Sequence, residues 1–252
     1  HYMHGILEAK KKGKPDSLLI RNLDIVITER CSLRCRDCAN LMQYFQKPAH
    51  SDFEQTIAAT HAVLDAIDYV NELHVLGGEP FLNCELPAYL ERLQEKSHRF
   101  GFILVFTNAT IIPHGDALQQ LKRSNILISI TDYGNPRQRA TELTELFDRE
   151  GIRYRLLVAT EWVDCARIFP RRRTSEQNRE IFHQCCVGRT PAIKDGRLFP
   201  CPFAGSASAL GAIPDETNEY VELLNQAVSD KELRNAIAEL LGRPFPKVCD
   251  YC

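Results

Sequence analysis

Hydrophobic and polar positions alternate along the first two thirds of the chain in short apolar segments separated by longer amphipathic ones. The apolar segments are rich in β-branched residues and predict strands at 23–29, 73–76, 102–106, 126–130 and 154–158. The stretches between them predict helices from residue 53 and at 86–93, 117–121 and 141–147. We interpret Ser51-Asp52-Phe53-Glu54 as a capping box that begins the first helix. Because strand and helix alternate at short spacing, we expect parallel strands with helical crossovers.

The pattern changes after residue 161. A polar stretch ending near His183 predicts a helix, and Asp195-Gly196 between two short apolar runs predicts a β-hairpin over 192–199. Two further helices are predicted at 220–227 and 231–241. We therefore expect two units, a larger one over 16–165 and a smaller one over 166–252.

Composition excludes several classes of protein. The chain has 252 residues, of which 44% are hydrophobic and 25% charged, as in a globular protein with one large α/β domain or a barrel with a small appendage. A formal net charge of -2 gives no electrostatic reason to expect a nucleic acid or a membrane as partner. No apolar run is long enough to cross a bilayer and no signal peptide is visible, so we expect a cytoplasmic protein.

Ten cysteines cluster toward the two ends of the chain, a distribution that favours a metal protein over a disulfide framework. Three of them, Cys31, Cys35 and Cys38, are separated by three and then two residues. Closely spaced thiolates are the soft ligands that iron–sulfur clusters prefer. Three thiolates on a four-iron cluster leave one iron open to a small molecule. The alternative is a structural zinc site, which normally needs a fourth ligand that is not evident nearby.

This C-x3-C-x2-C pattern after the first strand resembles the signature of the radical S-adenosylmethionine (SAM) enzymes, although Asp37 stands where the family often has an aromatic residue. The resemblance implies a partial parallel (β/α)6-type barrel with its site at the C-terminal strand ends. It also implies a [4Fe–4S] cluster on Cys31, Cys35 and Cys38 whose fourth iron chelates SAM. Reduction of SAM would give methionine and a 5′-deoxyadenosyl radical, which abstracts hydrogen from a substrate C–H bond.

Further strand ends carry residues that fit this family. Gly77-Gly78-Glu79-Pro80 resembles its GGEP element, in which paired glycines let a ligand approach the backbone and Glu79 would accept from the SAM ammonium. By itself, the same sequence could be a glycine turn before a helix. Thr107-Asn108 resembles the Thr-Asn-Gly element with Ala109 in place of glycine, and Ser129 is placed to contact the SAM carboxylate or ribose. Asp132 and Tyr133 lie just beyond and are candidate substrate contacts.

A second cysteine group surrounds the predicted hairpin. Cys185 or Cys186, then Gly196 and Cys201, resemble the opening of the SPASM and shorter twitch modules, which hold auxiliary iron–sulfur clusters. With Cys249 and Cys252, four ligands are available for one auxiliary [4Fe–4S] cluster, with Cys185 preferred to Cys186. The resemblance thus implies a small hairpin-plus-helix module. A zinc ribbon-like site from the same thiolates is the alternative.

Cys84 and Cys165 remain. Free cysteines are most often small buried hydrophobes, but either would be a hydrogen-atom donor if the enzyme were an epimerase.

Only about two dozen residues precede the first predicted strand, too few for a peptide-recognition domain, so we expect a small-molecule substrate. The resemblance implies an oxidoreductase that dehydrogenates a carbinol carbon of a sugar, aminocyclitol or nucleotide-linked sugar. An electron donor such as flavodoxin or ferredoxin would be its partner. An epimerase, a peptide-modifying enzyme and a zinc-binding interaction protein are the alternatives.

Overall fold

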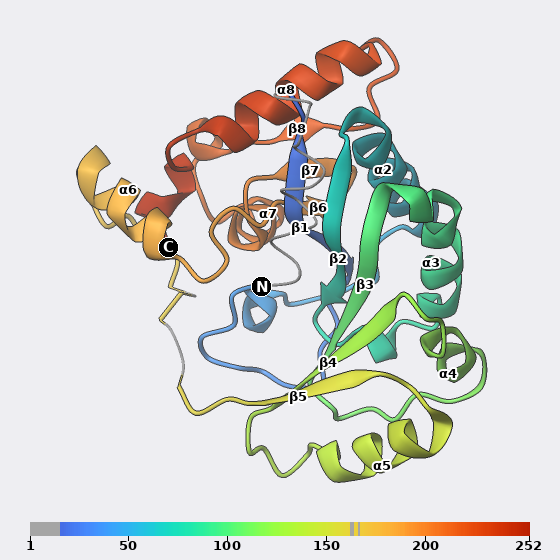
Figure 1. Ribbon diagram of the computed structural model, residues 1–252. Coiled ribbons are helices and arrows are strands. Elements are labelled where there is room, and N and C mark those ends of the chain that lie inside the picture. Colours follow the sequence, from blue (N-terminus) through green and yellow to red (C-terminus); the bar gives the residue numbers. More distant parts are fainter. Residues whose placement is uncertain (1–15, 162–163, 166) are drawn as a thin grey trace.

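The computed structural model describes residues 16–161, 164–165 and 167–252. Its strands form one eight-stranded sheet in the order β5-β4-β3-β2-β1-β6-β7-β8 (Figure 1). The strands are β1 (Leu19–Thr28), β2 (Tyr69–Gly77), β3 (Phe100–Thr107), β4 (Ile126–Asp132), β5 (Tyr154–Val158), β6 (Ala192–Lys194), β7 (Arg197–Phe199) and β8 (Val221–Glu222). The α-helices are α2 (Phe53–Ala66), α3 (Leu86–Leu93), α4 (Gly115–Leu121), α5 (Ala140–Glu150), α6 (Ser175–Gln184), α7 (Pro202–Ala209) and α8 (Asp230–Gly242). Short 3-10 helices are η1 (Met42–Tyr44), η2 (Pro80–Leu82), η3 (Gln94–Arg99), η4 (Asp215–Thr217) and η5 (Lys247–Asp250).

The predicted fold class is confirmed. Strands β1 to β5 are parallel, and β6 pairs parallel with the free side of β1, which gives six parallel strands in a sheet that does not close. Strands β7 and β8 are antiparallel additions at that end. Helices α2 to α5 cover one face of the sheet (Figure 1).

Alternation along the strands separates a dry face from a polar one. In β1, Leu23 and Ile25 are fully buried in the main hydrophobic core together with residues of α2 such as Leu64. Asn22 and Asp24 have the opposite parity, and both line a cavity on the other face of the sheet. Because side chains along a strand point alternately to its two faces, the helix-covered face holds the core and the other face holds the cavity.

The predicted hairpin is present between β6 and β7. Asp195 and Gly196 form its turn with φ values of 49° and 74°, the left-handed conformations that a two-residue hairpin turn of this kind needs. Ile193 pairs with Ile25 of β1, so the hairpin extends the core sheet across the predicted boundary near residue 165. The division into 16–165 and 166–252 therefore stays a prediction about folding units.

Two local predictions in the second half were wrong. The segment 220–227 is not a helix, because Val221–Glu222 pairs with β7 as strand β8 and Asn225 then accepts from the Ala227 N–H in a turn. Helix α7 was missed because its sequence, PFAGSASA, is made largely of small residues without helical periodicity. It begins at Cys201, whose sulfur accepts from the Ala204 N–H at 3.5 Å.

The capping box predicted at Ser51 was also wrong by one residue. Helix α2 begins at Phe53, so its N-cap is Asp52, whose side chain accepts from the Gln55 N–H at 2.8 Å. The Ser51 hydroxyl instead donates to the Val26 carbonyl of β1 at 2.7 Å. A serine one position outside the helix is therefore used to hold the helix entry against the sheet.

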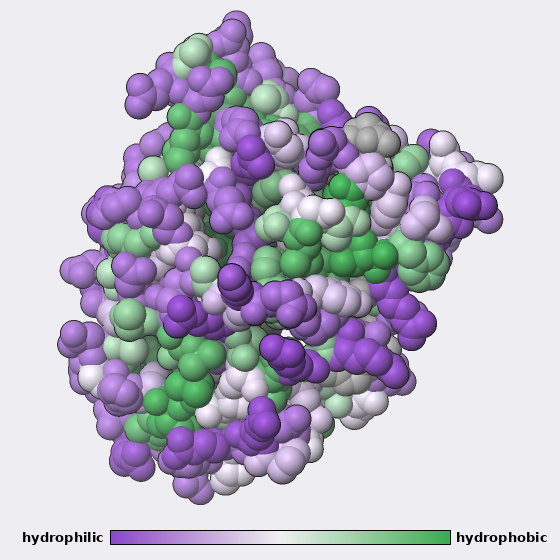
Figure 2. All heavy atoms as spheres, turned by 180° about the vertical axis from the view of Figure 1, so that it is seen from behind, coloured by the Kyte–Doolittle hydropathy of each residue, from purple (hydrophilic) through white to green (hydrophobic). Residues whose placement is uncertain are grey.

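The surface is mostly hydrophilic. Figure 2 shows the side opposite to Figure 1, where hydrophilic residues surround smaller hydrophobic patches. Among the exposed large hydrophobic residues, Leu156, Leu157 and Val158 belong to the edge strand β5. No helix among the described residues is long and apolar enough to cross a membrane.

Candidate active site between two cysteine groups

The first cysteine group lies in the loop that joins β1 to α2. Cys31, Cys35 and Cys38 are each partly buried, and all three line one cavity at the C-terminal ends of the parallel strands. Active sites of parallel β/α barrels are built at these strand ends because the connecting loops converge there.

Close contact with the end of β2 anchors this loop. The N–H groups of Gly78 and Glu79 donate to the carbonyls of Thr28 and Arg30 at 2.9 and 2.8 Å. A Cβ atom on Gly77 would lie 2.1 Å from the Thr28 oxygen, and one on Gly78 would lie 2.1 Å from the Arg30 oxygen. The backbone of the cysteine loop thus fills the space beside the two glycines, where a ligand had been expected. Glycine is required here so that the loop can join the strand edge.

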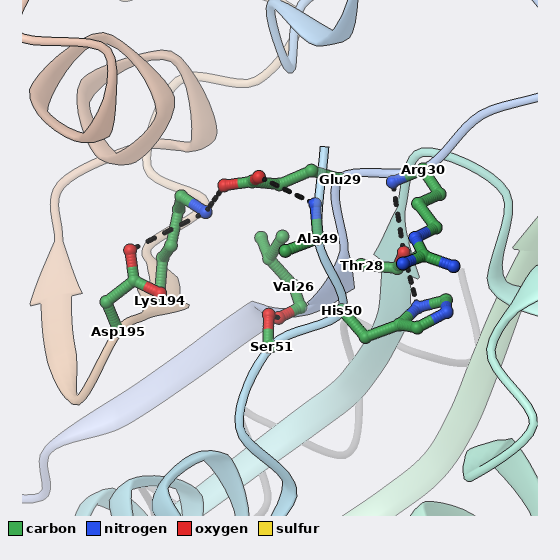
Figure 3. A network of polar contacts seen from close by, with 9 residues as sticks. All are labelled: Val26, Thr28, Glu29, Arg30, Ala49, His50, Ser51, Lys194 and Asp195. Carbon is green, nitrogen blue, oxygen red and sulfur yellow. Dashed lines mark hydrogen bonds and ion pairs between the residues drawn. The ribbon is translucent and has the colours of Figure 1, made fainter. Parts of the chain in front are cut away.

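A buried ion pair holds the same loop from its other side. Lys194 of β6 has a side chain only 2% exposed, and its Nζ lies 2.6 Å from Glu29 Oε1 (Figure 3). The second oxygen of Glu29 accepts from the Ala49 N–H at 3.2 Å. Nearby, Thr28 Oγ1 and His50 Nδ1 lie 2.9 Å apart. The hairpin of the second half therefore fixes both ends of the cysteine loop.

Glu79 joins the ends of β2 and β3. Its side chain is fully buried, and Oε1 accepts from the Thr107 hydroxyl at 2.9 Å and from the Phe81 N–H at 3.2 Å. Oε2 accepts from the Asn108 N–H at 2.8 Å. Burial raises the pKa of Glu79 to about 7, although these hydrogen bonds oppose the shift. A carboxylate has about four acceptor positions, so one on Oε2 is left for a further donor.

The segment after β3 contacts the cysteine loop directly. Asn108 donates from Nδ2 to the Cys31 sulfur at 3.6 Å and to the Ser32 hydroxyl at 3.3 Å. Ala109 follows with a φ of 56°, a left-handed conformation in which glycine would be unstrained. This left-handed backbone explains why the element that Thr107-Asn108 resembles ends in glycine. Ala109 adopts the same conformation at a cost in conformational free energy.

The cavity has a volume of about 500 Å³ and brings together most of the predicted site. Its predicted lining residues are Cys31, Cys35, Cys38, Gly77, Gly78, Thr107, Asn108, Tyr133 and Cys165. Burial raises the pKa of Tyr133 to about 12.

Other predicted site residues lie outside the cavity lining. Ser129 is fully buried and accepts from Arg155 Nε at 3.0 Å. Asp132 accepts from the Gly134 N–H at 2.8 Å, which shapes the turn that carries Tyr133. Cys84 is exposed and lies outside the cavity lining. The structure therefore does not bring Glu79, Ser129, Asp132 or Cys84 to the cavity lining.

Sequence reasoning missed a polar group on the cavity floor. Asp24 and His74 lie on adjacent strands in register, with Asp24 Oδ1 2.8 Å from His74 Nδ1. The other ring nitrogen, Nε2, lies 3.2 Å from Glu72 Oε2. Burial by itself would lower the pKa of His74, but the hydrogen bonds to Asp24 and Glu72 raise it to about 9. The sequence does contain a sign of this group, because polar residues recur at alternate positions of two otherwise apolar strands.

The second cysteine group gathers around the start of α7. Cys201 and Cys249 are buried, Cys185 and Cys252 are partly buried, and Cys186 is exposed. Burial raises the pKa values of Cys201 and Cys249 to about 12, and each of these two thiols lies within electrostatic reach of Cys252. Cys185 lies within reach of Cys201, and Cys186 within reach of Cys252, so both stay possible fourth ligands.

Cys165 lies between the two cysteine groups. Its sulfur donates to the Asp37 carbonyl at 3.9 Å, and its own carbonyl accepts from the Cys252 sulfur at 3.5 Å. Cys165 and Cys186 line the same cavity as the first cysteine group. The cavity is thus bounded by cysteines from both halves of the chain.

Comparison with known proteins bears on this arrangement. Residues 22–138, which include the first cysteine group and the ends of β2 to β4, match the family model of a 4Fe-4S single cluster domain. The GTP 3′,8-cyclase of Sulfurovum sp. (strain NBC37-1) is 26% identical over 106 residues. That match covers 41% of this chain and 31% of the relative, so the chain spans about a third of the curated relative's length. The first cysteine group therefore lies in a segment that is similar to 4Fe-4S single cluster domains.

Solved structures share the fold of this chain. BtrN, determined in complex with AdoMet and 2-DOIA, superposes with a TM-score of 0.58 at 14% identity, covering 92% of this chain and 93% of BtrN. Native anSMEcpe with bound AdoMet and the Cp18Cys peptide gives a TM-score of 0.51 at 12% identity, covering 92% and 98% of the two chains. Both likenesses extend over nearly the whole chain.

The thiols of the two cysteine groups fit iron–sulfur clusters. The first group supplies three thiols and its loop supplies no fourth, which suits a cluster with one open iron. Among the residues that the structure describes, no three His, Cys, Asp or Glu side chains converge as ligands of a single metal ion would. The thiolates of a cubane bind different irons and need not converge on one point.

Proposed function

We propose that this protein is a radical SAM oxidoreductase that dehydrogenates a carbinol carbon of a small molecule such as a sugar, aminocyclitol or nucleotide-linked sugar. The observation that carries the proposal is the position of the cavity. Cys31, Cys35 and Cys38 line it together with Cys165 and with Cys186, a candidate ligand of the second group. A substrate held there would lie within reach of thiols from both halves of the chain.

The two groups would have different roles. Cys31, Cys35 and Cys38 would hold the cluster that binds SAM, and Cys201, Cys249 and Cys252 with Cys185 or Cys186 would hold an auxiliary cluster with no open iron. When bound, the first cluster and SAM would supply a radical that takes one hydrogen atom from the carbinol carbon; the hydroxyl group would then lose its proton to solvent, and the second cluster would accept the remaining electron. A ketone is the product expected from loss of two hydrogens.

The chain's own residues would position the reactants. Gly77 and Gly78 hold the cysteine loop against β2, and Glu79 holds the end of β3 where Thr107 and Asn108 face the cavity. The acceptor position left on Glu79 would take the SAM ammonium. Tyr133 would contact the substrate from the β4 end of the cavity.

Mass spectrometry of an anaerobic turnover mixture tests this proposal. We expect 5′-deoxyadenosine, consumption of SAM, and a product two hydrogens lighter than the substrate. A product of unchanged mass that gains deuterium from solvent would instead support an epimerase. Absence of iron and sulfide after anaerobic reconstitution, with zinc bound in their place, would support the zinc-binding interaction protein.

One observation favours an epimerase as the second candidate. Epimerisation needs a hydrogen-atom donor in the cavity, and the thiol of Cys165 is placed there. A peptide-modifying enzyme is the remaining alternative, since anSMEcpe binds a peptide with the same overall fold.

A further inference from the structure

The cavity is lined by carboxylates and amides, with no lysine or arginine among the described lining residues. Its carboxylates are Asp24, Asp37 and Glu161, and its one basic side chain is His74. His74 lies between Asp24 and Glu72, at 2.8 and 3.2 Å. Two carboxylates therefore face one imidazole. Burial raises the pKa of Asp24, and the hydrogen bond and the charge of His74 oppose that rise.

Several oxygen acceptors on this lining have no donor. Asn22 Oδ1, Asp37 Oδ1 and Asn40 Oδ1 are buried without a hydrogen-bond partner among the described residues. Asp37 is only 8% exposed, and its second carboxylate oxygen accepts from Arg36 Nε at 2.9 Å. A buried acceptor that lacks a donor costs free energy, so these atoms indicate a ligand that brings N–H and O–H groups.

The Asn22 and Asp24 part of the cavity is separate from the expected SAM contacts. Asp24 lies on β1 four residues before the strand ends, and its N–H donates to the Pro191 carbonyl at 2.9 Å. Thr190, next to that proline, also lines the cavity. The residues expected to contact SAM are at the ends of β2 and β3 and on β4. The β1 wall carries none of them, which leaves it free to face a second ligand.

We propose that this second ligand is an amine-bearing polyhydroxylated small molecule whose ammonium group is bound at Asp24 and whose hydroxyl groups donate to the unpartnered oxygens. This inference rests on the proposed function, because it assigns the substrate class of the same cavity. A phosphorylated or nucleotide-linked sugar would place its phosphates against carboxylates with no arginine or lysine on the described lining to compensate. Like charges brought together in this way select against such ligands.

Equilibrium binding to the reconstituted protein with SAM tests the proposal. The probes are glucosamine with glucose, scyllo-inosamine with scyllo-inositol, and UDP-glucosamine. Within at least one pair, we expect the amine to bind about tenfold or more tightly than the neutral compound, with no binding of UDP-glucosamine. Equal or tighter binding of the neutral compounds, binding of UDP-glucosamine above its parent amine, or no amine binding at millimolar concentration would each overturn the proposal.

Substitutions locate the effect. Asp24→Asn should weaken amine binding by about tenfold or more while the affinities for SAM and for the neutral compound stay unchanged. Asp116→Asn, an exposed carboxylate on α4, is the matched control and should change nothing. Weaker SAM binding with unchanged amine binding in Asp24→Asn would contradict the assignment. If that variant melts at a lower temperature, Asn22→Leu, which removes an unpartnered acceptor on the same wall, should weaken binding of both the amine and the neutral compound while the affinity for SAM stays unchanged. Unchanged binding of both compounds would contradict the assignment.

The two proposals fail separately. If the amines bind but no probe promotes 5′-deoxyadenosine formation or loses hydrogen, the proposed reaction fails while the amine site stands. If 5′-deoxyadenosine forms with a neutral or nucleotide-linked sugar that binds more tightly than the amines, the proposed reaction stands and the amine site is wrong.

Discussion

Lys194 and Glu29 form a buried ion pair of 2.6 Å between a strand of the hairpin and the first residue of the cysteine loop. The pair joins segments 165 residues apart in sequence. It makes the conformation of the cysteine loop depend on the second half of the chain, which holds the second cysteine group. The two cysteine groups are therefore coupled by structure as well as by the cavity that they share.

Lys194→Met should destabilise the protein by about 3 kcal/mol, because it leaves the Glu29 carboxylate largely buried without its cation. Denaturant unfolding of the anaerobic protein measures this. Lys96→Met is the matched control, since Lys96 pairs with Asp65 at a site where the two side chains are 26% and 50% exposed, and should cost at most about 1 kcal/mol. Equal effects of the two substitutions would show that the buried pair does not hold the loop.

Gly78→Ala should displace the cysteine loop. Its Cβ would lie 2.1 Å from the Arg30 oxygen and 2.9 Å from the Cys31 Cβ, so backbone must move. We expect a loss of about 1–3 kcal/mol in stability and fewer irons retained after reconstitution. Gly242→Ala, in α8 with no atom near its added Cβ, should be neutral or stabilising. Full iron retention by Gly78→Ala would argue that the loop does not need this contact.

Glu79→Gln should weaken SAM binding without changing iron content. Loss of a charge-assisted hydrogen bond typically costs about 1.5–3 kcal/mol, so we expect the affinity to fall by about ten- to a hundredfold. Isothermal titration with SAM, alongside iron analysis, measures both quantities. Unchanged SAM affinity in a folded variant would leave Glu79 with only its role in joining β2 and β3.

The pH dependence of stability should report the burial of Glu79. Its folded-state pKa of about 7 lies above the ordinary value of 4.5, so the folded protein holds this proton more tightly than the unfolded chain. This contribution to stability is full below pH 4.5 and is lost as the pH rises through about 7. Unfolding free energies of the SAM-free protein measured across this range should therefore fall less steeply with pH in Glu79→Gln than in the unsubstituted protein. Parallel curves would contradict the shift.

The parallel sheet could be predicted because its strands are short, apolar and β-branched, and β5 begins and ends where the pattern places it. The cysteine loop followed from the spacing of its three cysteines, and the glycines from the resemblance of Gly77-Gly78-Glu79-Pro80 to the GGEP element. What the sequence did not reveal depends on tertiary contacts. Helix α7 is buried on all sides and has no amphipathic pattern, and the pairing of Asp24 with His74 requires the register of β1 and β2. The position of Cys165 depends on its contact with Asp37, which lies 128 residues away in the sequence. Local sequence patterns do not predict such a contact.

Cys165→Ala separates the two candidate reactions. If the enzyme is a dehydrogenase, the variant should still form the product that is two hydrogens lighter, because no hydrogen atom is returned to the substrate. If it is an epimerase that uses this thiol, the variant should still cleave SAM but should stop forming the epimer, because the thiol that returns a hydrogen atom to the substrate radical is gone.

Cys84→Ala is the control, since that thiol is exposed and outside the cavity lining. We expect both variants to retain dehydrogenation, measured as product mass per 5′-deoxyadenosine formed. Loss of product in Cys165→Ala alone, with SAM cleavage intact and both clusters loaded, would rule out a dehydrogenase in which Cys165 only lines the cavity.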